Sequence, residues 1–226
     1  MSIRERRARE KQQRERLIVT TARELAEAEG WEAVTTRRLA DAIEYSQPVL
    51  YSHFSSKDAI VQAVALEGFT QLAATLRDAR HAARSPRPAL LDLARAYLEF
   101  AHTRPALYDA MFTLAELPFA TSNTPAPLHE AFAELRQALA PFAPARDRDT
   151  LAEVVWSALH GLATLSRSDR LRPDHAEQRL ALLVRTATTS GRRVSLPYAA
   201  ASLAPTKTVP SARRCGDRSA AIVPEG

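Results

Sequence analysis

The chain has 226 residues, a formal net charge of +5, 6 glycines and one cysteine, and 46% of its residues are hydrophobic. This composition is globular and rich in the helix formers Ala, Leu, Arg and Glu, so it favours an all-α fold and excludes a disulfide framework or a cysteine-based zinc cluster. Because no apolar run approaches the roughly 18 residues that span a bilayer, and the N-terminus lacks the apolar stretch of a signal peptide, we expect a cytoplasmic protein with no membrane partner.

Residues 1–16 form a basic N-terminal arm, with seven arginines or lysines against three glutamates and little apolar periodicity. Residues 192–226 carry six basic against two acidic groups, so the body of the chain is mildly acidic. A basic arm suits contact with phosphates, and a solvated tail is the alternative. For residues 192–226 we favour a solvated and mostly disordered tail.

Three short helices are predicted between residues 17 and 60. The first has apolar residues at helical spacing from Leu17 and ends at Gly30, a typical C-cap residue. Either Thr35 or Thr36 can cap the second helix.

A brief turn at Glu44 and Tyr45 precedes the third helix, which Ser46 can cap. The apolar residues of the second and third helices can pack inward: Leu39, Ile43, Val49, Leu50 and Phe54. Small and polar residues are then left outside: Thr36, Arg37, Ser46, Gln47, Pro48, Tyr51, Ser52 and His53. A third helix that shows such residues to base edges, with apolar residues behind it, is typical of a helix-turn-helix.

The remaining helices belong to a second, larger domain at residues 61–191. Ser55 and Asp58 have the spacing of a capping box, and they start a fourth helix that reaches about Ala83. Apolar residues at helical spacing predict the later helices around residues 90–101, 107–112, 128–142, 148–167 and 173–187. The total is about nine helices, in which a helix-turn-helix domain at residues 17–60 precedes a helical bundle.

The residues of the first three helices closely resemble the signature of the TetR/AcrR family of transcriptional repressors, over about residues 12–62. The matching stretches are Ala22–Leu25, Glu29–Trp31, Val34–Ala40 and Tyr45–Ile60. A weaker resemblance, to a subgroup with a Trp…His-Gly pattern in its ligand-binding domain, rests on residues 155–162 and 108–112. The resemblance implies a DNA-binding N-terminal domain, a regulatory domain whose last two helices pair across a homodimer, and small, often apolar effectors.

The resemblance also implies which side chains contact DNA: Thr36, Arg37, Ser46, Gln47, Pro48, Tyr51, His53 and Lys57. Tyr51, His53 and Lys57 look like phosphate clamps. Thr36 looks like a phosphate contact from the start of the second helix. The alternative for Tyr51 is a spacer that holds the third helix against the first.

Gln47 and Pro48 are the best candidates for reading bases. A glutamine can make a bidentate contact with adenine, and a proline can pack on a thymine methyl group. This chain departs from the family at Glu44, where relatives commonly have glycine in the turn. If the backbone there is left-handed, a residue other than glycine costs on the order of 1 kcal/mol.

Aromatic and methionine side chains of the second domain are candidates for lining a ligand pocket: Tyr97, Phe100, Tyr108, Met111, Phe112, Phe132, Trp156 and His160. For each of them, an ordinary place in the core is the alternative. Trp156 and His160 lie four residues apart on one face of a helix. A histidine on an apolar face needs a partner, for which we favour a structural hydrogen bond over a ligand.

The sequence gives no support for an enzyme. The six histidines show no H-E-x-x-H spacing, and there is no P-loop or dinucleotide-binding glycine pattern, so we expect no catalytic site, no metal and no cofactor. We expect a regulator that binds double-stranded operator DNA as a homodimer, with about residues 148–190 forming the dimer interface. A small, apolar effector is expected to release it from DNA. The alternative is a helical interaction or small-molecule-binding module without DNA binding, against which the basic arm argues.

Overall fold

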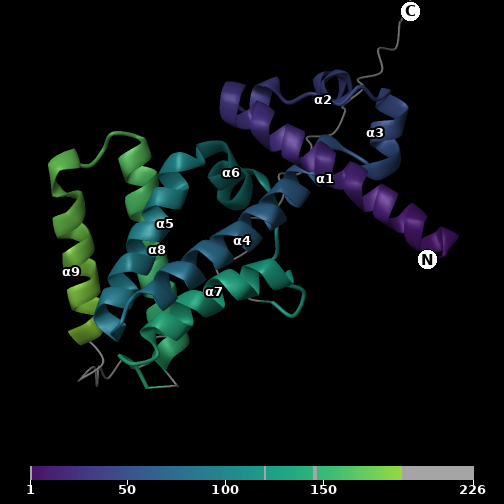
Figure 1. The fold of residues 1–226 in the computed structure, drawn as a ribbon. Coiled ribbons are helices and arrows are strands. Elements are labelled where there is room, and N and C mark those ends of the chain that lie inside the picture. Colours follow the sequence, from purple (N-terminus) through teal and green to yellow (C-terminus); the bar gives the residue numbers. More distant parts are fainter. Residues whose placement is uncertain (1, 120, 145–146, 190–226) are drawn as a thin grey trace, which may run out of the picture. The chain divides into compact units, whose positions relative to one another are not determined.

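The computed structural model describes residues 2–119, 121–144 and 147–189, and over these ranges the chain forms nine α-helices and no strand (Figure 1). The predicted all-α fold with about nine helices is therefore confirmed. The tail predicted at residues 192–226 lies outside the described residues.

Helix α1 (Ile3–Glu29) begins much earlier than the apolar pattern predicts. The expected start near Leu17 is wrong, because Ser2 and Glu5 form a capping box that starts the helix at the N-terminus. Apolar periodicity reports only the part of a helix that is buried, and this first part buries nothing. The helix ends at Gly30, whose φ of 82° requires glycine, as the sequence predicts.

Helices α2 (Thr36–Ala42) and α3 (Gln47–His53) follow a single 3₁₀ turn, η1 (Trp31–Ala33). Thr35 is the cap of α2, because its hydroxyl accepts a hydrogen bond from the amide of Arg38.

The turn between α2 and α3 is left-handed at Glu44, which has a φ of 57°. The amides of Glu44 and Tyr45 donate to the carbonyls of Asp41 and Ala40, which is the hydrogen-bonding pattern of a Schellman motif. Glu44 thus occupies the position that favours glycine, and the strain expected at this residue is present.

Helix α4 (Lys57–Ala82) contacts α1, α5 (Pro86–Thr103) and α7 (Ala126–Leu139). Its cap is Ser56, whose hydroxyl accepts from the amide of Ala59, so the predicted capping residue Ser55 is wrong by one position. Among the described helices, α4 alone is long and apolar enough to cross a membrane, but half of the relevant stretch is buried inside the protein. This burial is what a core helix requires.

A buried carboxylate fastens α4 to α7. Glu134 of α7 is buried, and its carboxylate oxygens accept hydrogen bonds from Arg77 at 2.8 Å and Arg80 at 2.7 Å. A buried carboxylate must be paired, so these two arginines satisfy Glu134 and fix the alignment of the two helices.

Helix α6 (Pro105–Asp109) continues into a π-helical turn, η2 (Ala110–Leu114), so the helix predicted over residues 107–112 is divided between the two. Gly68 of α4 faces the point where α6 continues into η2. A Cβ atom at Gly68 would lie 2.6 Å from Sδ of Met111, so the absence of a side chain allows α4 to approach η2 closely.

Helix α8 (Arg148–Arg167) matches its predicted range, and the last helix, α9 (Ala176–Thr189), begins after a 3₁₀ turn at Pro173–His175. Both helices contact α5, which places them beside the α4–α7 core. The end of α8 repeats the Schellman pattern, with Asp169 at a φ of 54°.

Candidate functional site

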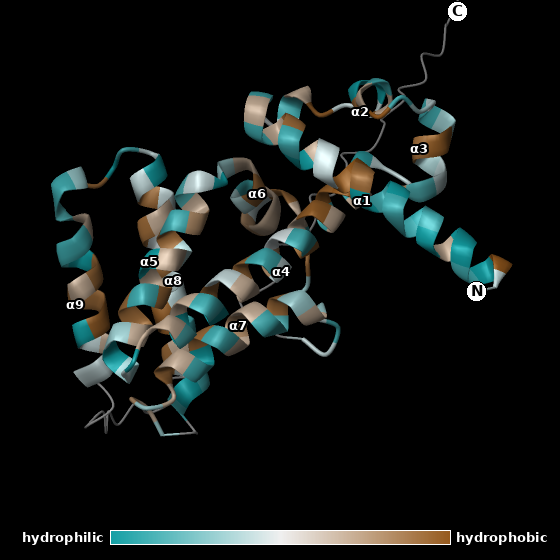
Figure 2. Cartoon of the chain, in the orientation of Figure 1, coloured by the Kyte–Doolittle hydropathy of each residue, from teal (hydrophilic) through white to brown (hydrophobic). Residues whose placement is uncertain are grey.

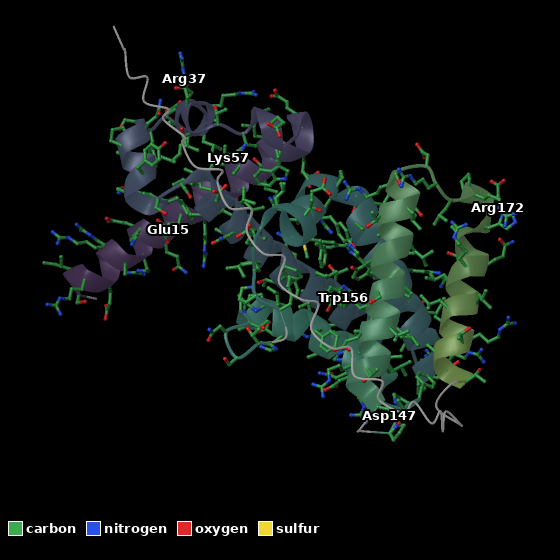
Figure 3. All side chains as sticks on the ribbon, turned by 180° about the vertical axis from the view of Figure 1, so that it is seen from behind. Glu15, Arg37, Lys57, Asp147, Trp156 and Arg172 are labelled. Carbon is green, nitrogen blue, oxygen red and sulfur yellow. The ribbon has the colours of Figure 1, made fainter. Side chains whose placement is uncertain are left out.

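The outer face of α2 and α3 carries most of the side chains that the sequence places at DNA. The structure leaves these predicted residues exposed: Arg37, Ser46, Gln47, Pro48 and Tyr51. Thr36 is half-buried, and Figure 3 shows Arg37 pointing away from the domain. Leu39 and Leu50 are buried behind this surface and anchor the two helices. The geometry is that of a rigid polar surface on an apolar base.

Val49 belongs to the outer face, although the sequence analysis placed it in the interior. Its side chain is 36% exposed, whereas the neighbouring Leu50 is fully buried. Successive residues of a helix point about 100° apart, so with Leu50 turned inward, Val49 is turned outward. Val49 thus adds an apolar group beside Gln47 and Pro48.

The side chain of His53 is turned inward, so its predicted position on the outside is wrong. Its side chain is 6% exposed, and its Nδ1 lies 3.7 Å from a carboxylate oxygen of Glu15 on α1. The early start of α1, which the sequence analysis missed, is what places Glu15 over His53. In this arrangement His53 packs α3 against α1 and does not present its ring to a phosphate.

Lys57 has a structural partner. Its ammonium donates a hydrogen bond of 2.8 Å to the carbonyl of Trp31, which ties the start of α4 to η1. A lysine in the first turn of a helix opposes the helix dipole, and this position is the one signal in the sequence that pointed to such a partner. Two of the three ammonium donors remain for other acceptors.

A second set of contacts joins α1 and η1 to α6. The carboxylate of Glu27 accepts hydrogen bonds from the amides of Ala106 at 3.1 Å and Leu107 at 2.9 Å. Pro105 has no amide proton, so Glu27 satisfies the free donors at the start of α6 and places a negative charge at its positive end. The indole of Trp31 donates to the carbonyl of Ala106 at 2.8 Å. We call these contacts the α1–α6 junction; sequence analysis missed it, because its residues lie far apart in the chain.

The second domain contains a cavity of about 280 Å³ among α4, α5, α7 and α8. Four of the predicted lining residues line it: Tyr97, Phe112, Phe132 and Trp156. Phe69 and Phe119, which were not predicted, also line it, and each packs against two of the other rings at 5.2–5.9 Å between ring centres. The cavity is therefore mainly aromatic and apolar.

The other four predicted residues do not line this cavity. Phe100 and Met111 are fully buried among other core residues. Tyr108 and His160 lie behind the wall, where their rings contact Phe112 at 4.6 and 5.0 Å between centres. They touch the cavity through a lining residue and not directly.

A chain of hydrogen bonds runs from the cavity wall to α6 and α8. The Tyr97 and Tyr108 hydroxyls are 2.9 Å apart, and the Tyr108 hydroxyl is 2.7 Å from Nδ1 of His160. Burial raises the pKa of Tyr97 to about 12, raises the pKa of Tyr108 further and lowers the pKa of His160. All three groups are therefore neutral at pH 7, and His160 has the structural hydrogen bond that the sequence analysis favoured.

Polar side chains also line the cavity. Arg136 of α7 and Asp149 of α8 line it and form an ion pair with each other. His129 and Glu153 line it as well, and both residues are exposed. No group of three or more His, Cys, Asp or Glu side chains that could hold a metal ion occurs in the part of the chain that the structure describes.

The outer face of α8 is apolar and turned away from the core. Val154 is 59% exposed and Leu165 is 38% exposed. Ala158 and Gly161 lie between them at helical spacing, and a Cβ atom at Gly161 would meet nothing within 4 Å. On α9, Leu182 is 52% exposed. These residues are an apolar surface that the described part of the chain does not cover.

Two family models match the chain. Residues 18–64 match the model described as "Bacterial regulatory proteins, tetR family", and residues 90–187 match the model described as "Tetracyclin repressor-like, C-terminal domain". The first match runs from the middle of α1 into the start of α4, and the second covers nearly all of α5–α9. They confirm the resemblance to the TetR family; the Trp…His-Gly subgroup stays a prediction.

Curated relatives are themselves described as regulators. An uncharacterized HTH-type transcriptional regulator, Rv0681 of Mycobacterium tuberculosis, is 30% identical over 149 residues, which are 66% of this chain and 67% of that protein. Another, YobS of Bacillus subtilis, is 33% identical over 96 residues, which are 42% of this chain. The match spans half the length of YobS.

Solved structures share the fold. A protein of unknown function from Rhodococcus sp. RHA1 has a TM-score of 0.68 at 24% identity, covering 79% of this chain and 95% of that one. BioQ, solved with its natural double-stranded DNA operator, has a TM-score of 0.57 at 20% identity, covering 77% of this chain and 98% of that one.

Proposed function

This chain belongs to the TetR family of bacterial transcriptional regulators, and on that premise we propose that it is a cytoplasmic repressor that binds operator DNA as a homodimer and is released by a small apolar effector. Its family consists of DNA-binding regulators with a C-terminal ligand-binding domain and not of enzymes. The proposed release by an effector rests on the α1–α6 junction. This junction connects α6, which contacts the wall of the aromatic cavity through Tyr108, to the first helix of the DNA-binding domain.

We assign DNA reading to the outer face of α2 and α3, within a DNA-binding domain of residues 17–60. Gln47 and Pro48 are exposed at the start of α3 and are proposed to contact base edges, with the exposed Val49 as a further apolar contact. Tyr51, Thr36 and the other exposed polar residues of this face are proposed to contact phosphates. His53 has no place in this proposal, because it is buried against α1.

Effector binding is assigned to the cavity, within a domain of residues 61–191. Its aromatic lining selects apolar or aromatic molecules. A molecule in the cavity displaces Tyr97 or Phe112, both of which contact Tyr108 on α6. Because Glu27 and Trp31 hold the start of α6, a shift of α6 moves α1 and η1 with it. The effector thereby changes how the helix-turn-helix meets DNA.

Dimerisation is assigned to the apolar outer face of α8 together with α9, within residues 148–190. Val154 and Leu165 supply apolar area, and Ala158 and Gly161 leave room between them for a partner helix to approach. One recognition helix covers few base pairs, whereas two copies about one helical turn apart give useful specificity.

Fluorescence anisotropy with DNA from the region upstream of the gene tests the DNA-binding role. We expect tight, salt-sensitive binding that exceeds binding to a shuffled duplex. Gln47→Ala should relax discrimination at one base position by about 1–3 kcal/mol, whereas Tyr51→Ala should weaken binding to every sequence. Equal binding to upstream and shuffled DNA would show that the upstream region holds no operator for this protein, and the lack of any salt-sensitive DNA binding would refute the regulator itself.

A thermal-shift screen with metabolites tests the effector role. Molecules that bind the cavity should raise the melting temperature and lower the affinity for DNA. Binding should depend on Phe132 of α7 and Trp156 of α8, which line the cavity and pack against each other. Ligands that stabilise the protein without changing its affinity for DNA would contradict the proposed release.

A further inference from the structure

The first four turns of α1, residues 3–16, project beyond the helices that α1 packs against, except for Glu15, which lies against His53; we call them the N-terminal extension. Its residues up to Arg14 are all exposed, and the first buried residue of α1 is Ile18. Figure 1 shows this segment leading away from α2 and α3, and Figure 2 shows it as predominantly hydrophilic. Because the extension adds no apolar contact to the core, the folding of the domain does not account for it.

Local interactions keep the extension helical. Beyond the capping box at Ser2, Arg6 pairs with Glu10 at 3.4 Å and Lys11 pairs with Glu15 at 3.7 Å, both at the i, i+4 spacing. Such pairs stabilise an exposed helix. The extension also continues a packed helix, so it incurs no cost of nucleation. It is therefore a rigid element on which side chains keep a fixed geometry.

Four cations of the extension share one face of the helix. They follow the spacing i, i+3, i+7 and i+10: Arg4, Arg7, Lys11 and Arg14. Glu15 lies next to this basic stripe and reaches His53 of α3, so the stripe lies on the side of α1 that is turned toward α3. Neither Arg7 nor Arg14 has an ion-pair partner among the described residues.

We propose that the basic stripe binds the phosphate backbone of duplex DNA beside the segment that α3 reads. The proposal rests on the DNA-binding function proposed above and adds a second contact surface to it. A helix rises about 1.5 Å per residue, so the stripe carries positive charge about 16 Å beyond Glu15, the length of roughly five base pairs. The extension would contact phosphates without reading bases.

The composition of the extension favours DNA over a membrane surface. A helix that binds at a lipid interface needs an apolar face to insert. The only apolar residues among positions 3–16 are Ile3 and Ala8, which cannot form one. The acidic balance of residues 17–60, with four basic against seven acidic groups, leaves the extension as the main positive surface beside the helix-turn-helix.

The test is the salt dependence of DNA binding by the full-length chain. R7Q/R14Q removes two charges from the stripe and keeps residues that favour a helix. R84Q/R87Q is the matched control, because it removes two exposed charges, one from the connection between α4 and α5 and one from the first turn of α5. Anisotropy titrations over a range of NaCl concentrations are made with upstream DNA and with a shuffled duplex, both long enough to extend beyond the contacts of α3.

We expect R7Q/R14Q to reduce the slope of log K against log[salt] by about 1.8 for each bound protomer, at about 0.9 for each lost phosphate contact. The reduction should be the same on both duplexes, and R84Q/R87Q should keep the wild-type slope. R7K/R14K keeps both positive charges and should therefore have the wild-type slope. This result would show that R7Q/R14Q acts through the loss of charge.

Equal slopes for R7Q/R14Q and R84Q/R87Q, with the wild type bound to DNA, would overturn the role of the stripe and leave the proposed regulator standing. Absence of DNA binding by the wild type would overturn both. Binding of the wild type to phosphatidylglycerol vesicles that R7Q/R14Q abolishes, with an unchanged DNA slope, would assign the stripe to a membrane surface and also overturn the proposal.

Discussion

Replacement of Glu27 by glutamine tests whether the α1–α6 junction holds the two domains together. Glu27 accepts hydrogen bonds from two backbone amides, those of Ala106 and Leu107, through its two carboxylate oxygens. A glutamine side chain has one acceptor oxygen, and its amide group would face the second donor. E27Q therefore keeps the size of the side chain but removes one hydrogen bond and the negative charge.

The expected cost follows from these two losses. A hydrogen bond to a charged group contributes about 1.5–3 kcal/mol, and a charge at a helix N-terminus contributes about 0.3–1 kcal/mol. The junction is only partly buried, so water can replace part of the lost contact. We expect E27Q to lower the free energy of unfolding by about 2 kcal/mol.

Urea unfolding, followed by the fluorescence of Trp31 and Trp156, measures this change. Glu24→Gln is the matched control on the same helix, because Glu24 is exposed and lies 4.0 Å from its partner Arg23. A surface substitution of this kind should change stability by less than about 0.5 kcal/mol. In the proposed function, E27Q should also reduce the loss of DNA affinity that an effector causes.

Equal stabilities of E27Q and E24Q would refute the energetic role assigned to the junction. An unchanged effector response in a destabilised E27Q would refute its role in coupling, because the stability loss shows that the contact was broken while the signal still passed.

Three further predictions concern the turn, the buried histidine and the dimer. Glu44→Gly should raise the free energy of unfolding by up to about 1 kcal/mol in thermal or urea unfolding, because the φ of 57° strains every residue except glycine; a loss of stability would show that the Glu44 side chain makes a contact that outweighs the strain. Because burial lowers the pKa of His160, the unfolded chain takes up the proton at a higher pH than the folded protein does, so the stability of the wild type should fall as the pH drops below the usual value of 6.5. His160→Gln should lack this part of the fall, and parallel pH profiles of the two proteins would exclude a contribution from His160. Val154→Glu should convert the dimer to a monomer in analytical ultracentrifugation without loss of helix content, whereas Leu114→Glu, which changes an exposed apolar residue outside α8, should leave it dimeric; a V154E protein that stays dimeric would place the interface elsewhere.

The sequence predicts the buried helices well because burial imposes a period. The range of α8 was predicted to the residue, and Gly30 and Thr35 mark helix ends by chemistry that is local. The start of α1 was missed because an exposed helix carries no apolar period. Its signal was the capping box at Ser2, followed by strong helix formers.

The predictions for the site residues succeed where a local pattern decides the position and fail where a contact from another helix does. Gln47 and Tyr51 are exposed as predicted, because a two-turn helix with Leu50 inward leaves little choice. His53 was misplaced because its cover comes from Glu15, a residue of a different helix. The α1–α6 junction joins residues about 80 positions apart, and no local pattern encodes such a contact.

The most direct test of operator binding is selection of DNA by the full-length protein from sheared genomic fragments of the organism that encodes it. We predict enrichment of a few fragments that share an inverted repeat, with half-sites about one helical turn or a multiple of it apart, and loss of that enrichment in Gln47→Ala. Recovery of fragments without sequence preference, by a protein that is folded and dimeric, would contradict it.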